Sequence, residues 1–104
     1  AVLQARRLIK ENIDSVPTIL ELSKRVALNK NKLQKAFQLT EGKSVGEYIR
    51  TLRMERALEL LEKSDLNTSE IAKAVGYHGL SNFYHAFQQK FGSTPQAVRD
   101  MLKK

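Results

Sequence analysis

Residues 69–95, SEIAKAVGYHGLSNFYHAFQQKFGSTP, contain two apolar patterns of helical period on either side of Gly76. The apolar positions are Ile71, Ala72, Val75, Phe83, Ala86 and Phe87. Spacings of three and four place each set on one face of a helix. A short helix, a tight turn at a small residue and a longer helix form a helix-turn-helix, although a plain helical hairpin has the same outline.

The same pattern occurs earlier in the chain. Glu21-Leu22-Ser23-Lys24-Arg25-Val26-Ala27-Leu28 aligns with Glu70-Ile71-Ala72-Lys73-Ala74-Val75-Gly76-Tyr77 at an offset of 49 residues. At an offset of 50, Leu33, Ala36, Phe37, Gln38, Gly42 and Ser44 align with Phe83, Ala86, Phe87, Gln88, Gly92 and Thr94. The extra residue falls near His78-Gly79. Two copies favour two helix-turn-helix units over a single helical hairpin.

Helix-boundary signals divide the rest of the chain. Thr18 with Glu21, Ser44 with Glu47 and Asn67 with Glu70 form three capping-box patterns. The other signals are an N-cap at Asn29, stops at Gly42 and Gly92, a cap at Thr94 before Pro95, and a first helix carrying Ile13 and ending before Pro17. The sequence therefore predicts an all-α fold of seven helices in one domain, 1–104. Within it we expect a first subdomain over about 1–43, a linker helix over about 44–63 and a second subdomain over about 64–104.

The composition narrows the functional class. Lys and Arg outnumber Asp and Glu by 18 to 11, which gives a net charge of +7 and favours an anionic partner such as nucleic acid. The absence of cysteine excludes disulfides and thiolate metal sites and fits a cytoplasmic protein. No apolar run approaches the roughly 20 residues of a membrane span. The chain starts at Ala1 without methionine, and we expect it to be a piece of a longer protein.

Catalytic and metal-binding patterns are absent from the sequence. The two histidines, His78 and His85, have no neighbouring carboxylates, and no glycine-rich phosphate loop or metal-ligand spacing occurs. We expect neither an enzyme nor a bound cofactor or metal.

The long, spaced pattern from Ser69 to Pro95 resembles the signature of the AraC/XylS family of bacterial transcription regulators. The matching residues are Ile71-Ala72, Val75-Gly76-Tyr77, Ser81, Phe83, Phe87, Phe91-Gly92 and Thr94-Pro95. Upstream, the linker pattern is matched by Gly42, Ser44, Tyr48-Ile49, Arg53, Ala57 and Leu60-Leu61. The resemblance covers about residues 18–99.

The resemblance implies two helix-turn-helix units on a linker helix that bind promoter DNA. It implies an effector-sensing or dimerising domain outside these residues, and RNA polymerase is a further candidate partner. Ala27, Thr68 and His85 depart from the family pattern, which more often has glycine, an apolar residue and arginine there. We expect the turn at Ala27 to be built without a positive φ, or at some energetic cost.

The polar faces of the two second helices are the candidate base-reading surfaces. Asparagine and glutamine can pair with adenine, and lysine can donate to guanine or phosphate. The candidates are Lys30, Asn31, Gln34 and Lys35 in the first copy and Ser81, Asn82, His85 and Gln89 in the second. Weaker candidates for phosphate contacts are Thr18, Lys43, Ser44, Arg50, Lys90 and Thr94, three of which are equally explained as helix caps.

These patterns predict sequence-specific binding of double-stranded DNA, with the two recognition helices in successive major grooves. The main alternative is a basic helical module that binds an acidic protein without reading base sequence. A membrane-surface helix bundle is disfavoured, because the basic residues do not lie opposite an exposed apolar stripe.

Overall fold

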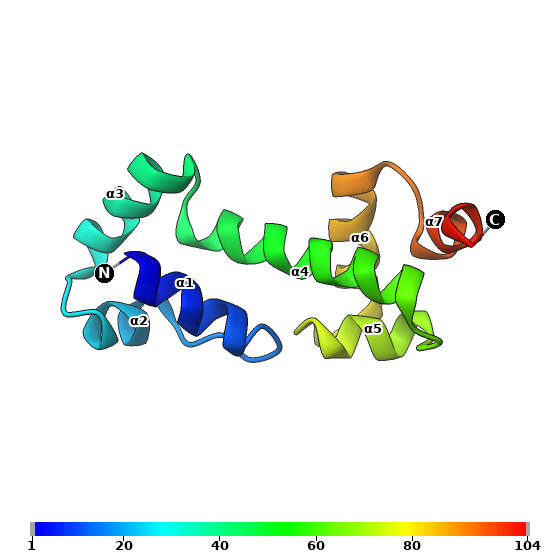
Figure 1. Ribbon diagram of the computed structural model, residues 1–104, viewed down its shortest axis with the longest axis horizontal. Coiled ribbons are helices and arrows are strands. Elements are labelled where there is room, and N and C mark those ends of the chain that lie inside the picture. Colours follow the sequence, from blue (N-terminus) through cyan, green and yellow to red (C-terminus); the bar gives the residue numbers. More distant parts are fainter. Residues whose placement is uncertain (1, 104) are drawn as a thin grey trace. The chain divides into compact units, whose positions relative to one another are not determined.

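The computed structural model describes residues 2–103 and contains seven helices and no strand in that range (Figure 1). The sequence prediction of an all-α, seven-helix fold is confirmed. The helices are α1 (Val2–Glu11), α2 (Ile19–Arg25), α3 (Lys30–Glu41), α4 (Val45–Lys63), α5 (Thr68–Ala74), α6 (Leu80–Phe91) and α7 (Pro95–Leu102).

Side-chain caps define where several helices begin. In α2 the Thr18 hydroxyl accepts from the Glu21 N–H at 3.2 Å, and the Glu21 carboxylate accepts from the Thr18 N–H at 3.1 Å. Asn67 and Glu70 form the same reciprocal pair before α5. These contacts satisfy N–H groups that have no partner within the helix.

The chain consists of two compact units, residues 1–52 and 53–104. The boundary lies inside α4, so the first half of this helix belongs to unit 1 and the second half to unit 2. The predicted linker helix therefore contributes to both hydrophobic cores. The core of unit 1 contains Ala5, Ile9, Leu22, Val26, Leu33, Phe37, Val45 and Tyr48. The core of unit 2 contains Met54, Ala57, Leu61, Ile71, Ala72, Val75, Phe83, Phe87 and Val98.

The internal repeat extends beyond the helix-turn-helix pattern. Every residue from 30 to 50 falls in the same class of solvent exposure as the residue 50 positions later. Residues 30–50 include the start of α4 in unit 1, and the equivalent residues 80–100 include most of α7 in unit 2. The first half of α4 thus occupies in unit 1 the place that α7 occupies in unit 2.

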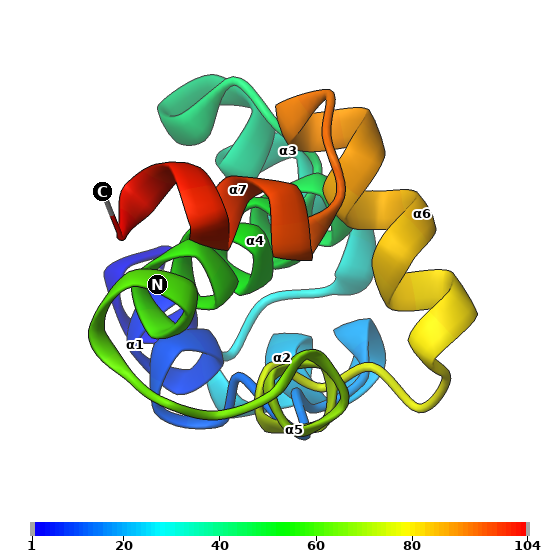
Figure 2. The same ribbon diagram turned by 90° about the vertical axis from the view of Figure 1, so that its right-hand side faces the viewer.

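Arg99 joins α7 to the C-terminal end of α4 within unit 2. Its guanidinium donates to the backbone carbonyl oxygens of Leu61 at 3.1 Å and Ser64 at 3.1 Å. The last carbonyls of a helix lack partners within the helix and carry partial negative charge, so a cation stabilises them. Figure 2 shows α4 nearly end-on in this unit, with α5, α6 and α7 around it.

The first helix is shorter than the sequence pattern suggests. It ends at Glu11, and a turn follows in which the Asn12 side chain donates to the Leu8 carbonyl oxygen at 2.9 Å. Ile13 still packs against the core of unit 1, but from this turn instead of from the helix. An apolar residue at helical spacing therefore misled the prediction of the helix end. In the part of the chain that the structure describes, no helix combines the length and apolar character of a membrane span.

Candidate nucleic-acid interface

In unit 1, α2 and α3 form a helix-turn-helix. The turn closes through the Leu28 N–H, which donates to the Ser23 carbonyl oxygen at 2.9 Å. Ala27 adopts a left-handed conformation with φ of 58°. Of the two possibilities expected for this position, the turn is therefore built with a positive φ, at a cost for a residue that has a Cβ.

Unit 2 repeats this turn with glycine in the left-handed position. Gly76 has φ of 96°, and the Tyr77 N–H donates to the Ala72 carbonyl oxygen at 2.9 Å. The Tyr77 ring packs edge-on against Phe83 with centroids 5.7 Å apart, and the Arg53 guanidinium lies 5.7 Å from the Tyr77 centroid. The equivalent backbone hydrogen bond in both units therefore closes the turn between the first and the second helix.

The inner faces of α3 and α6 are anchored by fully buried rings. Phe37 contacts Tyr48 edge-on in unit 1, with centroids 5.2 Å apart. Phe87 lies between Phe83 and Phe91 in unit 2, at 5.8 and 4.6 Å. These rings belong to the cores, so the opposite faces of α3 and α6 are the surfaces open to a ligand.

Seven of the eight predicted base-reading residues are exposed on these open faces. They are Lys30, Asn31 and Lys35 on α3, and Ser81, Asn82, His85 and Gln89 on α6. The sequence prediction omitted Lys32, which is exposed on α3. The repeat could have identified it, because Lys32 aligns with Asn82 at the offset of 50 residues.

Gln34 is placed differently from the other predicted base readers. Its side chain is half-buried, and its Oε1 atom accepts a hydrogen bond from the backbone N–H of Val45 at 3.0 Å. The side-chain oxygen of Gln34 is therefore hydrogen-bonded to the first residue of α4. Whether Gln34 also touches DNA stays a prediction.

The six weaker phosphate candidates fall into two groups. The Thr18, Ser44 and Thr94 hydroxyls each accept from the backbone N–H three residues later. The Thr18 hydroxyl also donates to the Glu21 carboxylate at 3.0 Å, so its one proton, which a phosphate would need, is used within the cap. The cationic candidates Arg50 and Lys90 are exposed, and Lys43 is half-buried.

The caps also lower the pKa values of two glutamates near helix starts and so favour their ionised form. Hydrogen bonds from the Thr18 backbone and then its side chain lower the pKa of Glu21 below its ordinary value. The backbone and side chain of Ser44 lower the pKa of Glu47 in the same way. Both groups are therefore ionised near neutral pH, and both reduce the local positive potential at these two helix starts.

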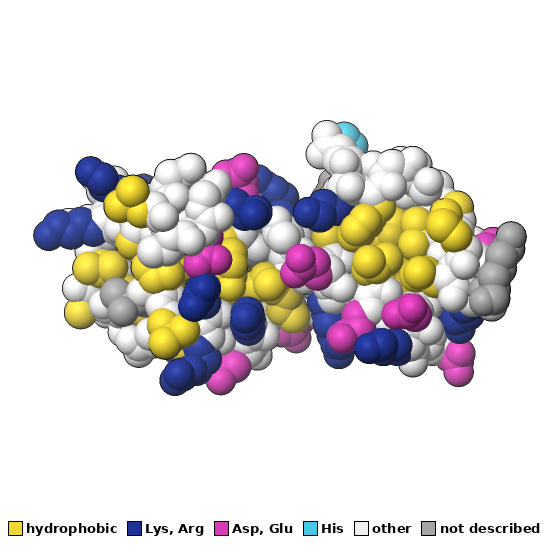
Figure 3. All heavy atoms as spheres, turned by 45° about the horizontal axis from the view of Figure 1, so that its top comes forward, with side chains coloured by type: hydrophobic (Ala, Val, Ile, Leu, Met, Phe, Trp, Pro, Cys, Tyr) yellow, Lys and Arg dark blue, Asp and Glu magenta, His cyan; other side chains and the backbone are white. Residues whose placement is uncertain are grey.

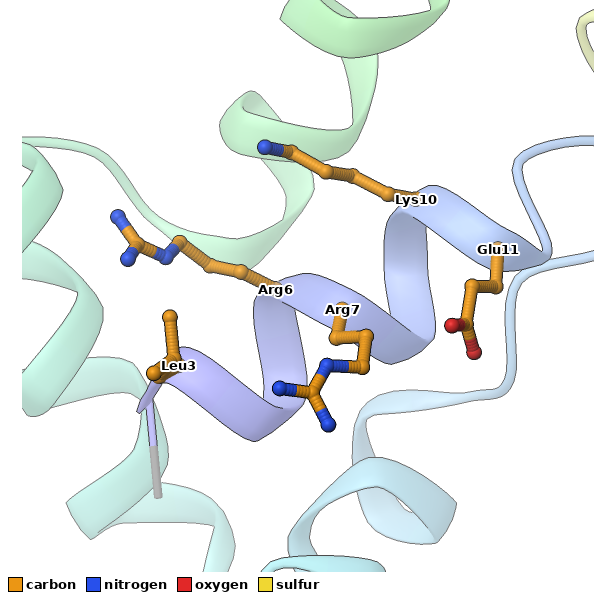
Figure 4. A pocket seen from close by; sticks show the side chains of 5 residues that line it. All are labelled: Leu3, Arg6, Arg7, Lys10 and Glu11. Carbon is orange, nitrogen blue, oxygen red and sulfur yellow. The ribbon is translucent and has the colours of Figure 1, made fainter.

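Two hollows on the surface contain basic residues. In unit 2 a hollow beside the turn is lined by Ser69, Ala72, Lys73, Tyr77, His78 and Leu80. The sequence prediction passed over Lys73, although it aligns with Lys24 in the repeat. In unit 1 the other hollow lies along α1, where Arg6 and Lys10 extend to one side and Arg7 and Glu11 to the other (Figure 4). Arg6 is already paired with Glu41 at 2.8 Å.

Charged side chains are distributed unevenly between the two second helices. Helix α3 carries Lys30, Lys32 and Lys35, whereas α6 carries Lys90 as its one lysine and no arginine. Figure 3 shows Lys and Arg side chains at the edge of unit 1 near α3, and a broad hydrophobic area on the visible face of unit 2. No group of three or more potential metal ligands occurs among residues 2–103.

Comparisons with known proteins agree with this geometry. A family model described as a helix-turn-helix domain matches residues 22–101. The Msm operon regulatory protein of Streptococcus mutans is 32% identical over 102 residues, which are 98% of this chain and 37% of that protein. The C-terminal domain of AraT, a response regulator from Geobacillus stearothermophilus, is 28% identical, with a TM-score of 0.90 over 96% of this chain and 84% of that one.

The DNA-binding domain of AdpA, solved in complex with a target DNA, shares the fold. Its TM-score is 0.92 at 22% identity, over 98% of this chain and 92% of that chain. The chain spans 26% to 37% of the length of the first curated relatives that it matches. The paired turns, the extended repeat and the match over residues 22–101 identify the chain as a DNA-binding domain of the AraC/XylS family of helix-turn-helix transcription regulators.

Proposed function

We propose that the chain binds specific double-stranded promoter DNA, with α3 and α6 each reading bases in a major groove. The observation that carries this proposal is the duplicated exposure pattern. Two helix-turn-helix units each bury one face of their second helix and expose a polar face at equivalent positions. A second helix of this kind reads base edges from the major groove in helix-turn-helix proteins.

The polar residues suit two different base sequences. Asn31 and Lys35 on α3 correspond to Ser81 and His85 on α6. Asparagine pairs bidentately with adenine, whereas serine and histidine donate or accept single hydrogen bonds. We therefore expect two half-sites of different sequence.

The length of the relatives adds further partners to this proposal. Since the curated relatives are roughly three times as long as this chain, we infer an effector-sensing or dimerising domain elsewhere in the protein. We place the protein in the cytoplasm, where promoter DNA and RNA polymerase are found, and we assign it no reaction.

Selection from a random duplex library, followed by a salt titration on the selected site, tests the proposal. We expect recovery of a site with two conserved half-sites about one helical turn apart. With about six phosphate contacts, the affinity should fall by orders of magnitude between about 50 and 200 mM salt. Equal affinity for all duplexes would instead support the alternative of a basic module that binds an acidic protein.

A further inference from the structure

Gln34 links the second helix of unit 1 to the helix that follows it. It lies on α3 between the buried Leu33 and the exposed Lys35, and its Oε1 atom accepts from the Val45 N–H at 3.0 Å. Val45 is the first residue of α4 and is only 3% exposed. A backbone N–H at this position has no partner within its own helix, so burial without an acceptor would be unfavourable.

Two other N–H groups at this helix start, those of Ser44 and Glu47, are satisfied by the cap. The Ser44 N–H donates to the Glu47 carboxylate at 3.0 Å, and the Glu47 N–H donates to the Ser44 hydroxyl at 3.2 Å. Gln34 supplies the acceptor for the Val45 N–H, from eleven residues earlier in the chain. The start of α4 is therefore completed by a side chain of α3.

In unit 2 the equivalent helix has no buried N–H at its first residue, so it needs no such contact. The position equivalent to Val45 is Pro95, which is fully buried and has no N–H to satisfy. The position equivalent to Gln34 is Tyr84, which packs against the core of unit 2. The copy that has a backbone N–H at this position thus pairs it with Gln34, whereas the copy with proline has no N–H to pair.

We propose that Gln34 is a positioning residue that holds α3 against the first turn of α4, and so fixes the orientation of the face that carries Asn31 and Lys35. It is not a base reader in this proposal. The part of the inference that concerns DNA rests on the proposed function, whereas the contact itself can be tested without DNA.

A double-mutant cycle between residues 34 and 45 tests the contact. Gln34→Met keeps the length of the side chain but removes the acceptor, so we expect a lower urea midpoint of unfolding. In a Val45→Pro background the N–H is gone, and Gln34→Met should then change the midpoint little. Equal losses in both backgrounds would overturn the proposal. Gln38→Met, at an exposed position of the same helix, is the matched control and should leave the midpoint unchanged.

Gln34→Glu provides a second test that does not depend on the proline variant. A carboxylate at residue 34 can still accept from the Val45 N–H, and the N-terminus of a helix favours negative charge. We expect the midpoint of this variant to stay close to that of the parent at neutral pH. A loss as large as that of Gln34→Met would contradict the assigned acceptor role.

Duplex selection then separates positioning from base reading. Loss of the positioning contact should weaken preference across the whole half-site read by α3. Val45→Pro removes the same contact and should have the same effect, and adding Gln34→Met in that background should change the affinity and the preference little. A change of preference at one base pair that Gln34→Met causes in both backgrounds would make Gln34 a base reader. If the parent itself shows no base preference, the proposed function fails, while the urea cycle still decides the contact.

Discussion

Exchanging the residue types at the two turns should move the stability of the chain in opposite directions. Ala27 and Gly76 occupy equivalent left-handed positions, with φ of 58° and 96°. The left-handed region costs an L-residue about 1–2 kcal/mol, which glycine avoids. Replacing alanine by glycine also raises the entropy of the unfolded chain, which opposes folding by about 0.5–1 kcal/mol. The difference lies between about 0 and 1.5 kcal/mol, so we expect Ala27→Gly to stabilise the chain by a net of about 0.75 kcal/mol, the middle of that range.

The expected change is large enough to measure by thermal and urea unfolding. For a chain of this size, 1 kcal/mol shifts the Tm by about 4–8 °C, so a stabilisation of about 0.75 kcal/mol should raise the Tm of Ala27→Gly by about 3–6 °C. The side chain of Ala27 is exposed, so its removal should sacrifice little packing. Gly76→Ala should lower the Tm by at least a similar amount, because its φ lies farther from the left-handed minimum near 57°.

Circular dichroism of both variants, with amide hydrogen exchange to localise each effect to its unit, completes the experiment. A lower urea midpoint for Ala27→Gly would refute the reasoning, since it would mean that the methyl group stabilises the turn by more than the strain it introduces. The DNA affinity of Ala27→Gly serves as a control. It should match that of the parent, because the exposed face of α3 is unchanged.

The remaining predictions concern the core, the interface and pH. Phe37→Ala and Phe87→Ala should each destabilise the fold by about 3–5 kcal/mol, because both rings are fully buried; parental unfolding midpoints would place the rings outside the core. Lys90→Ala, at an exposed candidate for a phosphate contact, should reduce the slope of log affinity against log salt by about 1 on every duplex, and an unchanged slope would show that this lysine is far from phosphate. The pKa of Glu21 is lower in the folded chain than its ordinary value of 4.5, so the ionised carboxylate stabilises the fold. This stabilisation is complete above pH 4.5 and is lost as pH falls through the lower pKa of the folded chain. Glu21→Gln should therefore make the free energy of unfolding depend less on pH in this acid range.

Local signals in the sequence predicted much of this fold. The caps at Thr18, Asn29 and Asn67 depend on contacts three residues apart, and each cap hydrogen bond is present in the structure. The repeat located both turns because buried positions recur at fixed spacing. Periodicity was weaker at the end of α1, where Ile13 fits the helical stripe but lies in a turn.

Contacts between distant residues account for what the sequence could not supply. The polarity of Gln34 does not indicate a hydrogen bond to a backbone group eleven residues later, and the sequence pattern alone predicts an exposed side chain. Arg99 likewise binds carbonyl oxygens 35 to 39 residues earlier in the chain. A pattern of neighbouring residues does not predict contacts over such distances. Both contacts complete a helix end, and both depend on packing that a linear pattern does not encode.

The two copies differ on their outward faces and at a helix end, whereas their turns close through the same backbone hydrogen bond and part of the core keeps the same residues. Phe37 and Phe87 are retained, whereas Lys35 is replaced by His85. A symmetric dimer of identical helix-turn-helix units reads a palindrome, because each half-site meets the same side chains. One chain with two different polar faces has no such requirement. If both faces read bases, the preferred DNA site of this chain is expected to be asymmetric, and its orientation would fix which unit lies on which half of the site.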